Sequence, residues 1–417
     1  MPEVIIVVGS NSVHTRRYIN GICNYNYKQN YVHNDNNHNH HNDSYSDNDS
    51  CLDYNSTKII FITNNQANLN ELPNNVKLHT INFKLINLAA RFQIARIISA
   101  YPNALIHIHQ ANSYAYHTLK AIKLIKLNKL FYKIFYKSYN ASSNNLGYKV
   151  ILTTWGSDIL QLPQKNILLK HMVKFNLTNS NMVTSDSLYM SAKIRALVPN
   201  INKLYTINFG IRNFPAQLDL TQKEKIILSN RLHKPMYNID KIIEAFAKLC
   251  IAYPDFKLVI AASGSETDKL KSLVASNLLA SHPHLNDKQI IFTGMIDYAQ
   301  LINWYRRAML FISIPNSDAT SLSLLEAMAY GCYPIVSNLP ANLEWVINGI
   351  NGIINETTEL LPENIEAAIN LSSEKISQAA KLNYSIIQQK AVFENNIQQF
   401  IELYNNISNK LSVTTAI

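Results

Sequence analysis

The sequence predicts an α/β protein with two doubly wound parallel sheets, one in each half of the chain. Short apolar runs of strand length alternate with longer segments of helical periodicity. This alternation occurs in two series, on either side of a turn-rich stretch near residues 210–220. Strands that alternate with helices form parallel sheets with right-handed crossovers. A length of 417 residues, 47% of them hydrophobic, is sufficient for two or three domains.

The first series contains four short, continuous apolar runs, as expected for strands buried on both faces of a parallel sheet. Helices are expected between them, in the segments that start at His14, Leu88 and Ser113. The predicted strands are Val4–Val8, Lys58–Thr63, Leu105–His109 and Val150–Thr153.

The second series has the same character, and one or two further helices are expected within Lys390–Leu411. The predicted strands are Ile226–Leu228, Phe256–Ala261, Gln289–Phe292, Leu310–Ile314 and Pro334–Val336. The predicted helices between them are Asp240–Cys250, Thr267–Leu278, Tyr298–Arg307 and Ser321–Tyr330.

The two series define the expected domains. We expect a Rossmann-like domain over residues 1–212, a second one over 213–392, and a C-terminal helix, 393–417, that packs back on the first domain. A low-complexity segment rich in Asn and His falls within residues 30–55, and its composition is typical of a disordered surface insertion. Metal binding by its histidines is the alternative, and these are His38, His40 and His41.

Composition limits the classes of partner and compartment. The net charge of +10 favours an anionic partner, such as nucleic acid, a phosphorylated ligand or anionic lipid headgroups. The four cysteines have no paired spacing, so neither a disulfide framework nor a zinc ribbon is indicated. The apolar start lacks a basic leader, and no run of 18 apolar residues occurs. We therefore expect a cytoplasmic protein without a membrane span.

A basic amphipathic helix is predicted within residues 120–137. Lysines recur there at helical spacing, and apolar residues fall on the opposite side. Such a helix can lie in the interface of an anionic membrane. An ordinary solvated lysine face over a core face explains the pattern equally well. The lysines are Lys123, Lys126, Lys129, Lys133 and Lys137.

Candidate site residues of the first half follow the strands, because ligands of doubly wound sheets bind beyond the carboxyl ends of the strands. Gly9 follows the first strand and opens a turn before a helix, where N–H groups can meet a phosphate or a sugar hydroxyl. The period-2 alternation of a strand places His107 and His109 on one face at a strand end. Asp158 follows Gly156 and suits sugar hydroxyls or, alternatively, a helix N-cap.

The second half offers an anion site. Arg231 and Lys234 follow a strand and suit a diphosphate, although a surface basic pair is the simpler explanation of these two residues alone. A helix that starts near Ser321 presents its N-terminal N–H groups and its dipole to the same edge of the sheet. It carries Glu326 and ends at Gly331, a typical C-cap glycine.

The stretch that runs from Asp318 through Glu326 to Gly331 resembles a known family. Its Asp318-x7-Glu326 pattern, with Leu-Leu-Glu-Ala-Met-Ala-Tyr-Gly, is similar to the acid–seven–acid motif of the retaining glycosyltransferases of family 4. The first acid is an aspartate here, one methylene shorter than the usual glutamate. Asn348–Gly352 resembles the Asn-Gly-x-x-Gly segment of that family, and Glu344 fits in front of it.

This resemblance implies the GT-B fold, in which two Rossmann-like domains face an interdomain cleft. It assigns the acceptor to the domain of residues 1–212 and the nucleotide-sugar donor to that of 213–392. The implied catalytic residues are Asp318 on the donor sugar, Glu326 on the ribose, and His109 and Asp158 on donor or acceptor hydroxyls. The implied donor-binding residues are Gly9, Arg231, Lys234, Gly294, Met295, Ser321, Leu322 and Leu325.

The implied activity is transfer of a sugar, with retention, from a nucleoside-diphosphate donor (UDP- or GDP-linked) to a hydroxyl of a glycan or lipid-linked acceptor, in surface polysaccharide or lipopolysaccharide synthesis. The resemblance implies no cofactor and no obligatory metal ion. We expect no nucleic-acid partner, and a protein in the cytoplasm or at the inner face of the inner membrane. Two alternatives stay open: a nucleotide-sugar epimerase on the same scaffold, and a non-catalytic protein that binds an anionic ligand.

Overall fold

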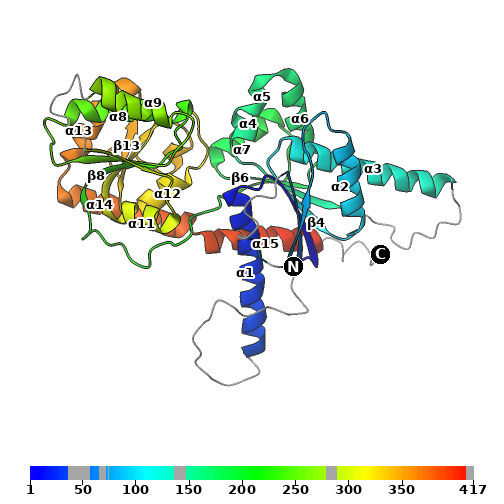
Figure 1. The fold of residues 1–417 in the computed structure, drawn as a ribbon. Coiled ribbons are helices and arrows are strands. Elements are labelled where there is room, and N and C mark those ends of the chain that lie inside the picture. The colour runs from blue at the N-terminus through cyan, green and yellow to red at the C-terminus, as the bar shows by residue number, and fades with distance from the viewer. Residues whose placement is uncertain (36–56, 65–71, 74, 136–146, 279–288, 410–417) are drawn as a thin grey trace. The chain divides into compact units, whose positions relative to one another are not determined.

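The computed structural model describes residues 1–35, 57–64, 72–73, 75–135, 147–278 and 289–409. These residues form two compact units (Figure 1). Unit 1 consists of Met1–Asp186, Met190–Ile207 and the C-terminal segment that starts at Ile397. Unit 2 consists of Ser187–Tyr189 and Asn208–Asn396. The chain passes from unit 1 into the long segment of unit 2 at Asn208, a few residues before the domain boundary that we expected after residue 212.

Unit 1 contains a parallel sheet of seven strands in the order β3-β2-β1-β4-β5-β6-β7. The predicted α/β class is confirmed, and the four predicted strands correspond to β1, β2, β4 and β5. The sequence analysis missed three strands, because β3 is only half-buried and β6 and β7 are very short. The strands are β1 Val4–Val8, β2 Lys58–Thr63, β3 Val76–Thr80, β4 Leu105–His109, β5 Lys149–Thr153, β6 Met182–Ser185 and β7 Leu204–Thr206.

Helices join these strands and include the last helix of the chain. They are α1 Val13–Asp35, α2 Ala89–Ser99, α3 Ser113–Phe135, α4 Ser157–Leu160, α5 Leu162–Lys165, α6 Ile167–Thr178, α7 Leu188–Leu197 and α15 Phe393–Asn409. Residues 30–35 continue α1 as helix, so the insertion that we expected from about residue 30 starts no earlier than residue 36. Residues 36–56, with the proposed metal-binding His38, His40 and His41, lie outside the described residues.

Unit 2 contains a second parallel sheet, of six strands in the order β10-β9-β8-β11-β12-β13. Its strands are β8 Glu224–Ser229, β9 Lys257–Ala261, β10 Ile290–Gly294, β11 Ala308–Ser313, β12 Tyr333–Ser337 and β13 Ile353–Asn355. Its helices are α8 Ile239–Leu249, α9 Thr267–Ser272 with a π-helical continuation Leu273–Leu278, α11 Tyr298–Arg307, α12 Leu322–Ala329, α13 Leu361–Ile369 and α14 Ser373–Lys390. Short 3₁₀ helices are Pro235–Tyr237, Asn342–Glu344 and Thr358–Leu360.

Both faces of the unit 2 sheet are covered. Leu310 and Ile312 of β11 belong to the apolar cluster under α8 and α13, whereas Phe311 belongs to the cluster under α12 and α14. The two groups of helices are visible on opposite sides of the sheet in Figure 1. Successive side chains of a strand point to opposite faces, and this double cover explains why the strands are continuous apolar runs.

Helices α1 and α15 cover one face of the unit 1 sheet. Tyr18 of α1 and Phe400 of α15 stack edge to face at 5.2 Å between ring centroids. Both rings also lie against His107 of β4, at 5.0 and 6.0 Å. The face of β4 that carries the predicted histidines therefore packs against two helices, and α15 completes the core of unit 1.

A buried polar network crosses this face. The Nδ1 atom of His107 lies 2.9 Å from the Tyr18 hydroxyl and 2.6 Å from the Tyr404 hydroxyl of α15. The Nε2 atom lies 2.6 Å from the Thr153 hydroxyl of β5, which is 2.7 Å from the Thr184 hydroxyl of β6. The network links α1, three strands and α15, and it satisfies polar groups that would otherwise be costly to bury.

Among the helices of the described residues, none has both the length and the apolar character required to cross a membrane.

The buried histidines predict loss of stability in mild acid. Burial, with a further contribution from His109, holds the pKa of His107 well below its ordinary value of 6.5, and burial lowers the pKa of His109 to about 3. Below pH 6.5 the unfolded chain gains protons that the folded chain does not, so stability is complete above that pH and falls below it. Each histidine removes about 1.4 kcal/mol per pH unit. Chemical unfolding measured between about pH 7.5 and 5.5 tests this.

The variant His107→Gln keeps a hydrogen-bonding side chain but does not titrate, so the slope of unfolding free energy against pH below pH 6.5 is expected to fall by about 1.4 kcal/mol per pH unit. His171→Gln is the matched control, because His171 is exposed on α6. The same pH slope in the wild type and in His107→Gln would contradict this account.

Candidate functional site

The strand order of each sheet reverses at one point. In unit 2 the chain proceeds outward from β8 to β9 and β10, and outward from β11 to β12 and β13. In unit 1 the reversal lies between β1 and β4. Ligands of doubly wound folds bind at such switch points, beyond the carboxyl ends of the strands. Arg231 follows β8 and Asp318 follows β11, whereas Gly9 follows β1 and His109 ends β4.

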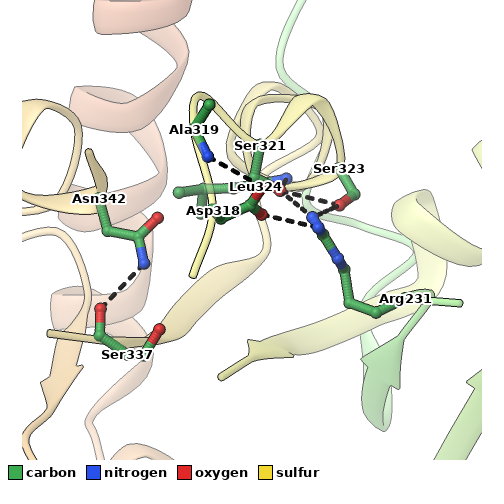
Figure 2. A network of polar contacts seen from close by, with 8 residues as sticks. All are labelled: Arg231, Asp318, Ala319, Ser321, Ser323, Leu324, Ser337 and Asn342. Carbon is green, nitrogen blue, oxygen red and sulfur yellow. Dashed lines mark hydrogen bonds and ion pairs between the residues drawn. The ribbon is translucent and has the colours of Figure 1, made fainter. Parts of the chain in front are cut away.

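Arg231 forms the centre of a polar cluster at the switch point of unit 2 (Figure 2). Its Nη2 atom lies 2.7 Å from Oδ2 of Asp318. Its Nη1 atom donates to the hydroxyls of Ser321 and Ser323, the latter at 3.0 Å. The face of the guanidinium lies 4.5 Å from the ring centroid of Tyr237. The sequence analysis assigned Arg231, Asp318 and Ser321 to one site, and in the structure Arg231 contacts both of the others.

Asp318 and Arg231 are both largely withdrawn from solvent, with side-chain exposures of 20% and 11%. Oδ1 of Asp318 also accepts the N–H of Ala319 at 3.0 Å. Burial raises the pKa of the Asp318 carboxyl, and Arg231 and the Ala319 N–H act in the opposite direction. The ion pair thus joins the loop after β8 to the loop after β11.

The N-terminus of α12 points into this cluster (Figure 2). Ser321 is its N-cap, and its hydroxyl accepts the N–H of Leu324 at 3.4 Å. The N–H groups of Leu322 and Ser323, in the first turn, have no intrahelical acceptor. A cation next to a helix N-terminus is a favourable place for an anion.

Leu325 does not face this site. Its side chain is completely buried in the core of unit 2, and its N–H donates to the Ser321 carbonyl at 3.2 Å. We expected Leu325 to bind the donor, but in the structure it anchors the helix. Leu322 is only partly buried at the start of α12.

Glu326 lies one helical turn further on and is 5% exposed. Its two carboxylate oxygens accept the hydroxyls of Tyr298 at 2.9 Å and Tyr305 at 3.0 Å. The Tyr305 hydroxyl in turn accepts the side-chain amide of Asn230 at 2.6 Å, directly before Arg231. Burial, followed by the Glu326 charge, raises the pKa of Tyr305 well above its ordinary value. Both acids of the motif thus belong to one connected polar system.

The sequence analysis missed Asn230, Tyr298 and Tyr305. A signal was available, because the two tyrosines are seven residues apart in a correctly predicted helix and therefore lie on one face of α11. No property of the isolated sequence indicated that this face meets Glu326.

The other donor-binding candidates of unit 2 lie on separate loops. Lys234 is exposed and lines a hollow of about 360 Å³ with residues of α8 and α9. Gly294 ends β10 in the left-handed region, with φ +67°, and Met295 after it is 68% exposed. An exposed methionine beside a left-handed glycine is available to a flat apolar group such as a base.

Gly9 and His109 meet at the switch point of unit 1. A Cβ atom at Gly9 would lie 2.9 Å from the Cβ atom of His109, so only glycine permits this approach. His109 is completely buried, and its ring lies 4.7 Å from that of Tyr18 and 5.6 Å from that of Trp155. The prediction that both histidines share a face is confirmed. That face is covered by helices, so His109 offers no exposed group to a ligand in this conformation.

The carboxylate of Asp158 binds backbone N–H groups of two loops. Its Oδ2 accepts the N–H of Ala111, after β4, at 2.6 Å, and its Oδ1 accepts the N–H of Trp155, after β5, at 2.9 Å. Gly156, with φ +104°, occupies the N-cap position of α4 that we had considered for Asp158. Burial raises the pKa of the Asp158 carboxyl, and its backbone hydrogen bonds oppose this. The carboxylate joins two loops at the carboxyl edge of the sheet.

The chain matches models of glycosyltransferase families. Residues 210–389 match glycosyl transferases group 1, and residues 119–187 match the glycosyl transferase 4-like family. Together the matches span more than half of the chain. With the two Rossmann-like units, they place the chain among the GT-B glycosyltransferases of group 1, of the family 4 type, as the acid–seven–acid motif suggested.

Curated relatives cover part of the chain. The alpha-monoglucosyldiacylglycerol synthase of Streptococcus pneumoniae is 26% identical over 220 residues, which are 49% of this chain and 48% of the relative. An uncharacterized glycosyltransferase of Methanocaldococcus jannaschii is 25% identical over 197 residues, 45% of this chain and 46% of the relative. The chain thus spans about half the length of the curated relatives that it matches.

Solved structures share the fold over nearly the whole chain. A glycosyltransferase from Rickettsia africae is 16% identical, with a TM-score of 0.70, over 97% of this chain and 98% of that one. HepE from Anabaena, crystallised with UDP and glucose, is 12% identical, with a TM-score of 0.67, over 97% and 100% of the two chains. At these identities the similarity establishes the fold alone.

The substitution Asp158→Asn separates a structural from a catalytic role. The amide presents an N–H group to one of the two backbone donors, so we expect a loss of about 1–3 kcal/mol of unfolding free energy. Thermal or chemical unfolding measures this, and the same change at exposed Asp255 in unit 2 is the control. Unchanged stability together with lost activity would contradict the structural assignment.

Proposed function

We propose that this chain transfers a sugar from a nucleoside-diphosphate sugar to a hydroxyl of a glycan or lipid-linked acceptor, with retention of the anomeric configuration. The observation that carries this proposal is the position of Arg231, held by Asp318, Ser321 and Ser323 at the N-terminus of α12. This arrangement places a fixed cation and unpaired helix N–H groups at the switch point of a Rossmann-like unit.

The cluster is suited to a diphosphate. A guanidinium carries five N–H donors, and the contacts to Asp318, Ser321 and Ser323 account for three of them among the described residues. The remaining donors and the N–H groups of α12 can bind phosphate oxygens. Lys234, three residues from Arg231, adds a mobile charge. This set supports charge neutralisation by the protein itself, and we propose no cofactor and no obligatory metal ion.

The two acids suit the two sugars of the donor. We propose that Glu326 binds the ribose hydroxyls and exchanges its contact with the partly buried Tyr298, while buried Tyr305 keeps the carboxylate oriented. Asp318 lies closer to Arg231 and would bind hydroxyls of the transferred sugar. Gly294 and Met295 would contact the base. Gly9, His109 and Asp158 would act from unit 1, the proposed acceptor unit, through the loops that they shape.

The chemical step breaks the bond between the anomeric carbon and the diphosphate oxygen. A bond from the acceptor oxygen forms on the same face of the sugar, and the acceptor proton passes to the departing phosphate oxygen. Negative charge grows on the diphosphate as the bond breaks. Arg231 and the N-terminus of α12 would stabilise this charge, and such preorganised donors act most strongly where water is excluded.

The comparisons favour particular substrates. HepE was crystallised with UDP and with UDP-glucose, so a UDP-sugar is the first donor to test, followed by GDP-sugars. A relative named as a monoglucosyldiacylglycerol synthase favours a lipid-linked acceptor. We propose a role in surface polysaccharide or lipopolysaccharide synthesis, at the cytoplasmic side of the inner membrane.

A donor screen tests the proposal. A ligand that binds only the folded state raises the melting temperature, so at least one nucleotide sugar is expected to stabilise the wild type. Arg231→Gln is expected to lose this shift and to slow donor turnover by about 100-fold or more. Differential scanning fluorimetry and chromatography of the released nucleotide measure the two effects. Arg307→Gln is the control, because Arg307 pairs with Glu224 at the surface of the same unit.

Two outcomes would overturn this function. If no nucleotide sugar in a complete panel raises the melting temperature, the proposed donor site is contradicted. Accumulation of free epimerised nucleotide sugar, without an acceptor, would indicate an epimerase instead.

A further inference from the structure

Unit 1 carries a group of exposed apolar side chains at the start of α2. Leu85, Ile86, Leu88 and Phe92 have exposures of 40%, 88%, 56% and 66%. They lie within eight consecutive residues, 85–92, so they form one patch and not scattered single residues. We call residues 84–96 the α2 surface.

The patch covers the turn before α2 and continues onto the outward side of that helix. Ala90, Ile94 and Ile98 of α2 are completely buried in the core of unit 1. Leu88 and Phe92 are spaced by four residues on the opposite side, where Arg96 continues the row. A soluble helix normally places polar residues at such positions, so the apolar residues require another explanation.

The sequence segment that contains the patch carries charge of one sign. From residue 72 to residue 157 the sequence contains eleven lysines or arginines and no aspartate or glutamate. Lys84 and Arg96 of the α2 surface are exposed, and Arg91 is partly exposed and lies 5.4 Å from the Tyr116 ring on α3. An apolar patch within a purely cationic region complements a surface that offers both anionic groups and hydrocarbon.

The described part of α3 suits this role less well. Ala121, Ile122 and Ile125 are buried in the core, and Lys123 lies over the Phe175 ring at 4.6 Å. Of its described residues, Leu127 is the exposed large apolar one, at 62%. Membrane contact was one of two alternatives for the segment 120–137, and its side chains from residue 129 onward lie outside the described residues.

A polar hollow of about 660 Å³ adjoins the α2 surface and shares Lys84 with it. Its lining includes Asn64, Thr80, Asn82 and Ser113. Hydroxyl and amide groups of this kind can bind the polar headgroup of an amphiphile whose hydrocarbon remains in a bilayer next to Leu85 and Ile86.

We propose that the α2 surface docks on an anionic phospholipid membrane. Ile86 and Phe92 insert between the acyl chains, and Lys84, Arg91 and Arg96 contact lipid phosphates. The partner is a bilayer and not nucleic acid, because three of the four apolar residues of the patch, including the most exposed one, Ile86, are aliphatic and cannot stack on bases. The proposal extends the lipid-linked acceptor suggested above, but membrane binding is measured without donor or acceptor and stands or falls separately.

Vesicle sedimentation tests this proposal with the full chain. The wild type is expected to bind vesicles of phosphatidylcholine with phosphatidylglycerol at low salt, and to bind pure phosphatidylcholine weakly. Ile86→Ser/Phe92→Ser is expected to lower the partition coefficient by about tenfold or more. Lys84→Glu/Arg96→Glu is expected to abolish the preference for anionic vesicles and the salt dependence.

Ile251→Ser/Leu360→Ser is the matched control, because these residues are 60% and 46% exposed in unit 2. It is expected to bind vesicles as the wild type does, and melting temperatures verify that all variants fold. Three results would overturn the proposal: no vesicle binding by the wild type, unchanged binding by the Ile86→Ser/Phe92→Ser variant, or binding of duplex DNA that vesicles do not compete.

Discussion

The ion pair between Arg231 and Asp318 is the interaction on which the proposed site depends. It exists because β8 and β11 are neighbours at the switch point of the unit 2 sheet, so the loops after them meet although 87 residues separate the two side chains. The pair fixes a cation against the first turn of α12. Without ligand, Asp318 neutralises that cation. We propose that the phosphates of a bound donor share this cation, which would leave Asp318 available to the sugar.

The same topology produces a different result in unit 1. Gly9 and His109 also meet at a switch point, but α1 and α15 cover the β4 face that carries the histidine. Asp158 uses both carboxylate oxygens to join two loops. Residues that the family resemblance assigns to substrate thus divide into two groups: a cationic cluster in unit 2 that retains unused N–H donors, and packed residues in unit 1 that hold the loops of that unit.

The sequence was most informative about features that depend only on residues close together in the chain. Val4–Val8, Leu105–His109 and Tyr298–Arg307 were predicted to the residue, because apolar runs and helical periodicity are properties of consecutive residues. The Asp318–Glu326 spacing likewise pointed to the loop and helix that contact Arg231 directly, and Asn230 through Tyr305, in the structure. Tertiary contacts could not be predicted in this way. The tyrosines on Glu326, the cover over His109 and the exposure of Phe92 all depend on which helix faces which sheet.

The most direct test of the Arg231 site is the affinity difference between a nucleoside diphosphate and the corresponding monophosphate, measured by isothermal titration calorimetry. The wild type is expected to favour UDP over UMP by about tenfold or more, because a charge-assisted contact contributes at least 1.4 kcal/mol. In Arg231→Gln this preference is expected to disappear while UMP affinity changes little. An unchanged preference in the variant would contradict the assignment of Arg231 to the diphosphate.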